Sequence, residues 1–372
     1  MGFIAANRLS LSLNTTTKKN KSTSRVARTE SSGPTIVGIT ATISLDAMSG
    51  DLGAEVVVRA AASTLQKHTR LELLLVGDRF ELDGLIKRIV GDEARMRVVQ
   101  ATEIVAMSDA PVDAVRRKKD SSMRVAINLV KSGEAQACVS AGNTGALMAT
   151  AKFVLKMLPG IDRPAIIAEL PSIGGSLHML DLGANTLGTA EQLFQFAVMG
   201  SIVAANVKGI EHPRIAILNI GAEDTKGHDA VKDAALLLHA STLNYIGFIE
   251  GSELFSGKAD VVVTDGFTGN IALKTVEGTV GLMRQHLLRA FTRHWFAKLQ
   301  GLLARPVLSR LALDTDSRNY NGATLVGLNG IVIKSHGSAD SYAFQHAIDT
   351  AVVEVQNQVP QQIGSLLRRE VA

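Results

Sequence analysis

The stretch Ala137-Cys138-Val139-Ser140-Ala141-Gly142-Asn143-Thr144-Gly145-Ala146-Leu147 passes from a short apolar run, through a polar turn with two glycines, into a helical pattern. A second stretch has the same arrangement, because Val261-Val262-Val263 precedes Asp265-Gly266-Phe267-Thr268-Gly269-Asn270-Ile271 and another helical pattern. Continuous apolar runs are typical of strands that are buried on both faces. Strand, Gly-containing turn and helix in this order indicate the repeating unit of a parallel sheet covered by helices.

Apolar runs alternate with helical patterns from Thr35 to the C-terminus. This alternation predicts a three-layer α/β/α fold with a largely parallel sheet for residues 35–372. Of the 372 residues, 46% are hydrophobic and 20% are charged, which suits a globular protein with a large core.

Residues 1–34 carry six basic residues and one acid, so the net charge of +4 belongs to this segment and the rest of the chain is close to neutral. We therefore expect no nucleic-acid binding. The segment is polar and has no periodicity, which predicts a disordered basic extension. An organelle transit peptide is the alternative.

Cys138 is the only cysteine, which excludes a disulfide within the chain and fits a reducing compartment such as the cytoplasm. It lies in a predicted strand, so we interpret it as a buried thiol and not as a nucleophile. Motifs for dinucleotides, P-loop nucleotides, zinc and hydrolase serines are absent, and we expect no metal or cofactor. No apolar run is long enough to predict a membrane span.

The predicted strands end in polar, Gly-rich segments, and ligands of parallel α/β sheets bind beyond such ends. These segments are Asp46–Asp51, Ser140–Gly145, Asp181–Asn185, Asn219–Gly227, Thr264–Asn270 and Lys334–Gly337. In two of them glycine and threonine stand directly before a helix. Each of these two is either an anion site or a helix capped by Thr144 or Thr268.

Two segments are basic. Arg116–Lys119 is either a solvated run or a contact for phosphate or an acidic carrier protein. Residues 278–313 contain no acid and mix basic with large apolar residues, and Pro306 suggests a break within a helical hairpin. Such a segment indicates an anionic membrane surface or acidic partner, and a dimer or core helix is the alternative.

The chain resembles the PlsX family of phosphate acyltransferases from about Thr35 onward, through several motifs at these strand ends. The motifs are Leu45–Asp51, Lys118–Met123, Ser140–Ala149, Asp181–Asn185, Leu218–Gly221, Thr225–Gly227, Gly257–Val263, Asp265–Asn270 and Gly327–Gly337. Departures from the family pattern occur at Ser49, Thr186–Gly188 and Thr264.

The resemblance implies a cytoplasmic, homodimeric, peripheral membrane enzyme of phospholipid synthesis. It would transfer a fatty acyl group from acyl-[acyl-carrier-protein] to inorganic phosphate. The acyl phosphate would pass to a PlsY-type membrane glycerol-3-phosphate acyltransferase. The fold would be similar to those of phosphate acetyltransferases and isocitrate-dehydrogenase-like enzymes.

The expected site residues fall into three groups. The catalytic candidates are Lys226, Asn143, Asp265 and His336. The substrate-binding candidates are Asp46, Gly50, Asp51, Lys119, Ser121, Gly142, Thr144, Gly145, Asp181, Asn185, Gly266, Thr268, Gly269 and Asn270. The candidates for membrane or carrier contact are Arg284, Arg289, Trp295, Phe296 and Lys298.

Within these groups, Lys226 and the amides of the two Gly-Thr turns could hold phosphate, and His336 or Asp265 could accept its proton. Asn143, Asn185 or Asn270 could donate to the thioester oxygen. Three other functions remain open. They are a phosphate acetyl- or butyryltransferase that uses coenzyme A thioesters, an isocitrate-type dehydrogenase, and a silent membrane scaffold.

Overall fold

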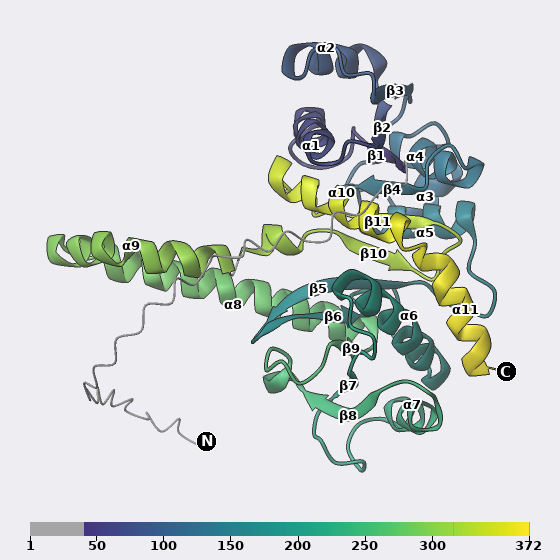
Figure 1. Cartoon of the computed structure of the whole chain (residues 1–372), viewed down its shortest axis with the longest axis vertical. Helices are drawn as coiled ribbons and strands as arrows, with labels where there is room; N and C mark the ends of the chain where they lie inside the picture. The colour runs from purple at the N-terminus through teal and green to yellow at the C-terminus, as the bar shows by residue number, and fades with distance from the viewer. Residues whose placement is uncertain (1–40, 315, 372) are drawn as a thin grey trace, which may run out of the picture. The chain divides into compact units, whose positions relative to one another are not determined.

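A computed structural model describes residues 41–314 and 316–371, which belong to one compact unit (Figure 1). The extension expected at residues 1–34 lies outside this range. The strands are β1 (Ala41–Asp46), β2 (Leu71–Gly77), β3 (Met96–Gln100), β4 (Ala137–Ser140), β5 (Ala165–Ser172), β6 (Gly175–Leu180), β7 (Ile215–Asn219), β8 (Tyr245–Glu250), β9 (Val261–Val263), β10 (Ala323–Val326) and β11 (Ile331–Lys334).

Helices and short 3-10 turns separate these strands. They are α1 (Ala54–Lys67), α2 (Arg79–Ile89), α3 (Pro111–Arg116), α4 (Ser122–Ser132), α5 (Thr144–Leu155), α6 (Ala190–Lys208), α7 (Asp229–Ala240), η1 (Gly251–Glu253), α8 (Gly266–Thr292), α9 (Trp295–Asp314), η2 (Ser317–Tyr320), α10 (Ser341–Gln356) and α11 (Val359–Val371). The predicted alternation of strands and helices is confirmed.

All the strands form one 11-stranded sheet in the order β3-β2-β1-β4-β11-β10-β5-β6-β9-β7-β8. The group β1, β2, β3, β4 and β11 is parallel, and so is the group β6, β7, β8 and β9. Between the groups, β10 is antiparallel to β11 and β5, and β5 is antiparallel to β6. The prediction of a largely parallel sheet is therefore confirmed, but its two parallel groups run in opposite directions.

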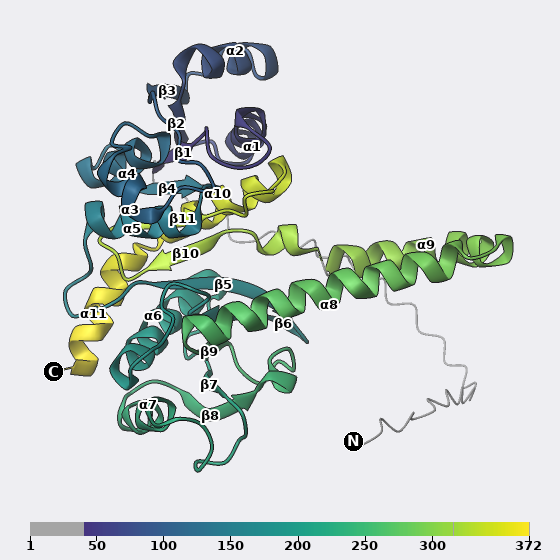
Figure 2. The same cartoon turned by 180° about the vertical axis from the view of Figure 1, so that it is seen from behind.

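Helices cover both faces of the sheet, as Figure 2 shows from behind. On one face α1 and α10 pack on the first group, and α6, α7 and α11 pack on the second. On the other face α4 and α5 cover the first group, and the beginning of α8 packs on the second. These packed faces form the hydrophobic core of the predicted three-layer fold.

Helices α8 and α9 form the predicted helical hairpin, and they run side by side away from the sheet in Figures 1 and 2. Gly301 of α9 lies against Phe291 of α8, where an added Cβ would be 3.2 Å from the Phe291 Cβ. The chain turns at Arg293 and His294, whereas Pro306 lies inside α9. The predicted break at Pro306 is therefore wrong. No helix among the described residues is long and apolar enough to cross a membrane.

Candidate active site

Three polar residues stand side by side at the ends of three neighbouring strands. Asp46, Ser140 and Lys334 are the last residues of β1, β4 and β11. The register pairs Ser140 with Asp46 on one side and with Lys334 on the other. Residues paired in this way point to the same face of a sheet. We call these three residues the strand-end row.

Asp46 and Ser140 of the strand-end row are buried and Lys334 is half-buried, but the hydrogen bonding around the row is incomplete. Ser140 Oγ donates to Asp46 Oδ2 at 2.6 Å and accepts the Gly142 amide at 3.1 Å. Asp46 Oδ1 and Ser49 Oγ are buried and have no hydrogen-bond partner among the described residues. Buried polar groups are nearly always hydrogen-bonded. These two open polar atoms therefore indicate groups that a ligand or water completes.

Lys334 brings a positive charge into the row. Burial lowers the pKa of Lys334 to about 8, and the nearby carboxylates of Asp46 and Asp51 oppose that shift. Its Nζ donates to the carbonyls of Ser335 and, at 3.5 Å, Ala141. A lysine in this state binds an anion as the ammonium and loses its proton at mildly alkaline pH.

The loops after β1 and β11 hold each other above the row. The Asp51 amide donates to the Gly337 carbonyl at 2.8 Å. Gly50 has a φ of +106°, and a Cβ there would lie 3.1 Å from the Ala141 Cβ. Glycine suits both this backbone conformation and this close approach. Gly50 thus keeps the loops packed around Asp46, while Asp51 stays exposed at the edge.

Helix α5 begins beside the row and is capped by Asn143. Asn143 Oδ1 accepts the Ala146 amide at 2.9 Å, and its Nδ2 donates to the Met107 carbonyl at 2.7 Å. The expected cap at Thr144 is therefore wrong by one residue. The cap is uncharged, the first turn has no acid, and Thr144 and Gly145 are exposed. A helix N-terminus of this kind attracts anions.

Helix α8 begins with a similar sequence but with an acidic cap. Asp265 Oδ1 accepts the Thr268 amide and Oδ2 accepts the Thr268 hydroxyl, both at 2.8 Å. The cap is thus Asp265 and not Thr268. A carboxylate already neutralises this helix end, so a second anion is disfavoured there. Of the two predicted anion loops, the structure favours the one at α5.

Asp181 organises the loop after β6. Its Oδ1 accepts the amides of Ile166 and Ala184 at 2.9 and 3.0 Å, and its Oδ2 accepts the amide and side chain of Asn185 at 2.7 and 2.9 Å. Burial raises the pKa of Asp181, and these bonds oppose the rise. Asn185 Nδ2 also donates to the Pro164 carbonyl. Both side chains, expected to bind substrate, are thus engaged in holding the loop.

Two glycines let α8 start directly on this loop. A Cβ at Gly266 would lie 2.4 Å from the Asn185 carbonyl oxygen, and one at Gly269 would lie 2.0 Å from the Asp181 carbonyl oxygen. Asn270 packs beside the same loop, where a Cβ at Gly183 would lie 3.6 Å from the Asn270 Cβ. These glycines, expected to contact substrate, serve close packing of the backbone in this structure.

Lys226 lies on the exposed loop after β7. Asn219, the last residue of β7, holds this loop, because its Nδ2 donates to the Lys226 carbonyl at 3.2 Å and its Oδ1 accepts the Ile220 amide at 2.9 Å. Within the described residues, no hydrogen bond or ion pair joins the Lys226 side chain to the strand-end row.

The remaining predicted residues differ in accessibility. His336 is exposed, and its Nδ1 lies 2.9 Å from the Ser338 hydroxyl, while its amide donates to Asn321 Oδ1. Ser121 is buried and caps α4 through its hydroxyl, whereas Lys119 is exposed just before that helix. His336 therefore retains an accessible ring, and Ser121 has a structural bond.

The five residues predicted for membrane or carrier contact all lie on the α8–α9 hairpin and are all exposed. They are Arg284, Arg289, Trp295, Phe296 and Lys298. Their side chains are therefore placed where a partner could reach them.

The predicted residues form two clusters on one face of the sheet. The first is the strand-end row with its loops and the start of α5, and the second is the start of α8 with the loops after β6 and β7. Ala323 and Leu325, alternate residues of β10, pack into the cores beneath the second and the first cluster respectively. They point to the same face. The two clusters belong to oppositely directed strand groups.

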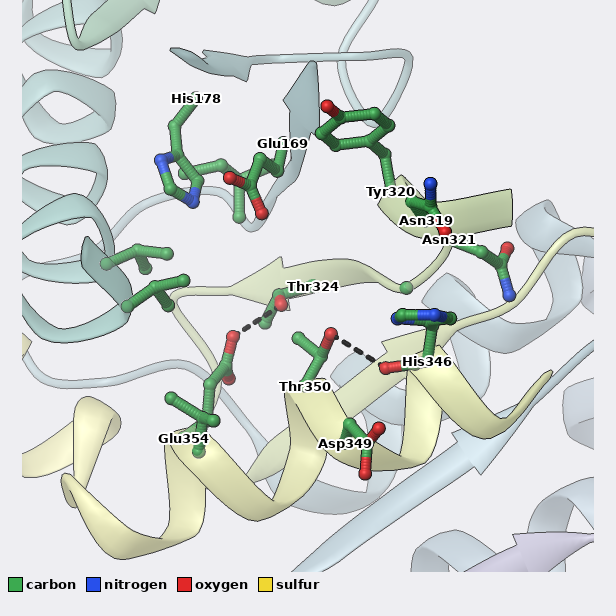
Figure 3. A pocket seen from close by; sticks show the side chains of 15 residues that line it. Glu169, His178, Asn319, Tyr320, Asn321, Thr324, His346, Asp349, Thr350 and Glu354 are labelled. Carbon is green, nitrogen blue, oxygen red and sulfur yellow. Dashed lines mark hydrogen bonds between the residues drawn. The ribbon is translucent and has the colours of Figure 1, made fainter. Parts of the chain in front are cut away.

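A separate cavity of about 180 Å³ lies on the opposite face of the sheet (Figure 3). Thr324 lines this cavity, whereas the next residue of β10, Leu325, points to the face of the two clusters. Its lining is mostly polar and includes Glu169, His178, Asn321, Thr324, His346, Asp349, Thr350 and Glu354. Glu354 accepts the Thr324 hydroxyl at 2.5 Å, and burial raises its pKa to about 7. The sequence does not reveal this cavity, because its residues come from distant segments without a shared motif.

Cys138 is buried, and burial raises the pKa of its thiol, which confirms the interpretation as a buried thiol. Among residues 41–314 and 316–371, no group of three His, Cys, Asp or Glu side chains is arranged to hold a metal ion.

Sequence reasoning missed Lys334 as a candidate for the site. The available signal was its place in a polar strand end between a buried strand and a turn.

Comparison with known proteins agrees with this architecture. A family model described as "Fatty acid synthesis protein" matches residues 41–362. A phosphate acyltransferase of Alkalilimnicola ehrlichii is 55% identical over 332 residues, which cover 89% of this chain and 97% of the relative. A phosphate acyltransferase of Methylococcus capsulatus is 55% identical over 326 residues, which cover 87% and 96%.

Among solved structures, a phosphotransacetylase from Streptococcus pyogenes matches with a TM-score of 0.58 at 19% identity, covering 85% of this chain and 94% of that chain. The EutD phosphotransacetylase from Staphylococcus aureus matches with a TM-score of 0.54 at 16% identity, covering 86% and 94%. At such identities the likeness shows the fold alone.

The fold defines an α/β protein with the architecture of the phosphotransacetylases. The matches in sequence make this class specific. The chain belongs to the family described as fatty acid synthesis protein, together with the phosphate acyltransferases named above, and it is an acyltransferase. The resemblance found in the sequence is thereby confirmed.

Proposed function

We propose that this enzyme transfers a fatty acyl group from acyl carrier protein to inorganic phosphate, and that the acyl phosphate feeds phosphatidic acid synthesis. The observation that carries the proposal is the strand-end row beside the uncharged cap of α5. The relatives' name, phosphate acyltransferase, supports phosphate as the acceptor. Attack of phosphate on a thioester needs an anion site and an aligned donor, and no covalent enzyme intermediate.

Phosphate would lie between the start of α5 and Lys334. The amides of Thr144 and Gly145 begin the helix and supply donors, and the Lys334 ammonium supplies charge. Asp46 Oδ1, which lacks a partner among the described residues, would accept the hydroxyl of monohydrogen phosphate. This arrangement turns one phosphate oxygen toward the donor and fixes the others.

In the reaction, one oxygen of monohydrogen phosphate attacks the thioester carbonyl carbon. The new C–O bond replaces the C–S bond, and the departing carrier thiolate takes up the proton that the phosphate loses. We favour His336 over Asp265 as the group that relays this proton, because Asp265 uses both carboxylate oxygens on Thr268. The His336 ring is exposed, two residues after Lys334 in the chain.

We further propose that the hairpin receives the acidic carrier protein and an anionic membrane surface. Its exposed Arg284, Arg289 and Lys298 stand among apolar groups such as Trp295 and Phe296, in a segment without acids. The family resemblance supports a cytoplasmic homodimer at the membrane that passes its product to a PlsY-type acyltransferase. Carrier affinity that does not fall with rising salt would contradict this role of the hairpin.

The donor decides between this function and its alternatives. Formation of acyl phosphate, trapped as the hydroxamate, should be compared for palmitoyl-[acyl-carrier-protein] and acetyl-coenzyme A in the presence of phosphate. We expect kcat/KM to be at least about a hundredfold higher for the carrier-bound palmitoyl group. Equal or better use of acetyl-coenzyme A would assign a phosphate acetyltransferase instead. No product from any donor would favour a silent scaffold.

A further inference from the structure

Large apolar side chains face solvent around the second cluster. Leu187 and Ile220 are each 81% exposed, Phe267 is 59% exposed and Ile271 is 50% exposed. They lie in the segments that follow β6, β7 and β9, which are neighbours in the order β6-β9-β7. Single exposed apolar residues are ordinary, but several at the ends of adjacent strands indicate a binding surface. We call these four residues the apolar rim.

Backbone contacts bring two parts of the rim together. The Gly266 amide donates to the Asn185 carbonyl at 2.8 Å, which holds the loop after β6 against the start of α8. Leu187 lies in that loop, and Phe267 directly follows Gly266. Phe267 and Ile271 are four residues apart in α8 and so lie on one side of the helix.

The third part of the rim follows from strand register. Ile217 of β7 pairs with Val263 of β9. Two residues further along these parallel strands, Asn219 ends β7 and Asp265 caps α8. Ile220 therefore leaves the sheet next to the first turn of α8, which carries Phe267.

We propose that the apolar rim binds the hydrocarbon chain of the acyl donor. This inference rests on the proposed function and adds the residues that select its long alkyl chain. The first cluster, on the same face of the sheet, offers the anion site. The second cluster does not, because the Asp265 carboxylate caps α8. Apolar surface there is suited to the apolar part of the same substrate.

The rim is separate from the apolar surface of the hairpin. Both surfaces involve α8, but Lys274 and Glu277 lie between them on this helix and are exposed. The acid-free segment begins only after Glu277. Charges at this point interrupt a continuous surface for membrane lipid. A single alkyl chain therefore fits the rim better than a bilayer does.

The test is the dependence of activity on chain length. Leu187→Ser and Phe267→Ser should lower kcat/KM for palmitoyl-[acyl-carrier-protein] about tenfold and for the butyryl donor less than about twofold. Phe267→Leu should retain most of the activity with palmitoyl. The matched controls are Phe80→Ser and Leu236→Ser, which remove side chains that are 92% and 68% exposed on α2 and α7. They should leave both donors unaffected.

Equilibrium binding separates the rim from the proposed function. Wild-type protein should bind decyl phosphate, below its micelle concentration, more tightly than butyl phosphate, and the two serine variants should lose this difference. That result would support the rim even if the wild type formed no acyl phosphate, in which case the proposed function alone fails. Equal loss with both donors, or unchanged preference for decyl phosphate, would overturn the rim. So would a changed particle mass, which would assign these residues to an interface between copies.

Discussion

The Lys334 ammonium lies near the Asp46 carboxylate, and each charge offsets part of the desolvation cost of the other. Because the pKa of Lys334 is lowered to about 8, the ammonium prevails below that pH and the neutral amine above it. We therefore expect the KM for phosphate to rise about tenfold per pH unit above about 8. Steady-state kinetics across this range measure it. Lys334→Arg should move the rise to higher pH, because guanidinium stays charged.

Lys226 is the matched comparison for this prediction, since it is exposed on another loop. Lys334→Ala should raise the KM for phosphate more than Lys226→Ala does. A larger rise in KM for phosphate in Lys226→Ala than in Lys334→Ala would place the phosphate site in the second cluster. If the KM of Lys334→Arg still rose above about pH 8 as in the wild type, another group would cause the rise.

Glu354 contributes to a pH dependence of stability on the other face of the sheet. Its folded pKa of about 7 lies above the ordinary value of 4.5, so the folded state binds the proton more tightly. The free energy of unfolding should fall as pH rises from about 4.5 to about 7 and level off above that, by up to about 3 kcal/mol. Urea denaturation at a series of pH values measures this.

Glu354→Gln is the control for that measurement. The amide keeps an acceptor for the Thr324 hydroxyl and cannot ionise. The variant should lose most of the fall in stability between these pH values. A variant that follows the wild-type curve would exclude Glu354 as its source.

Helices α5 and α8 begin with related sequences but differ in the charge of the cap. The uncharged Asn143 leaves the start of α5 attractive to anions, whereas Asp265 occupies the start of α8. Asn143→Asp should preserve capping, since both residues cap well, but should raise the KM for phosphate about tenfold through like-charge repulsion. Thermal unfolding reports the lost bond to the Met107 carbonyl separately.

Asp265→Asn is the converse change and should leave the KM for phosphate nearly unchanged. If instead Asp265→Asn affected phosphate strongly and Asn143→Asp did not, the anion site would belong to α8. The two variants change the cap charge in opposite senses at equivalent helix positions, so they compare the two helix starts.

For the whole molecule, local sequence was a good guide to the layers and a poor guide to strand direction. Apolar runs such as Val261–Val263 predicted buried strands correctly. The reversal between the two parallel groups depends on β5 and β10, whose pairing has no local signature. The strands β10 and β11, separated by a Gly-containing turn, were not predicted.

The candidate site was predictable as a set of strand ends, but the part that each side chain plays was not. Asp181 and Asp46 each directly follow an apolar run and look equivalent in the sequence. In the fold, both Asp181 oxygens accept hydrogen bonds, from β5 and from its own loop, whereas one Asp46 oxygen has no partner among the described residues. Hydrogen-bond saturation of this kind depends on tertiary contacts, which residue types do not encode.

Direct attack of phosphate on the thioester is the central claim, and the mass of the enzyme during turnover with labelled phosphate tests it most directly. The enzyme should be mixed with palmitoyl-[acyl-carrier-protein] and phosphate labelled with ¹⁸O at every oxygen, and product and protein analysed by mass spectrometry. We expect acyl phosphate that retains all the label, one free carrier thiol per product, and an enzyme of unchanged mass. Release of carrier thiol without phosphate, together with an acylated enzyme, would contradict the account.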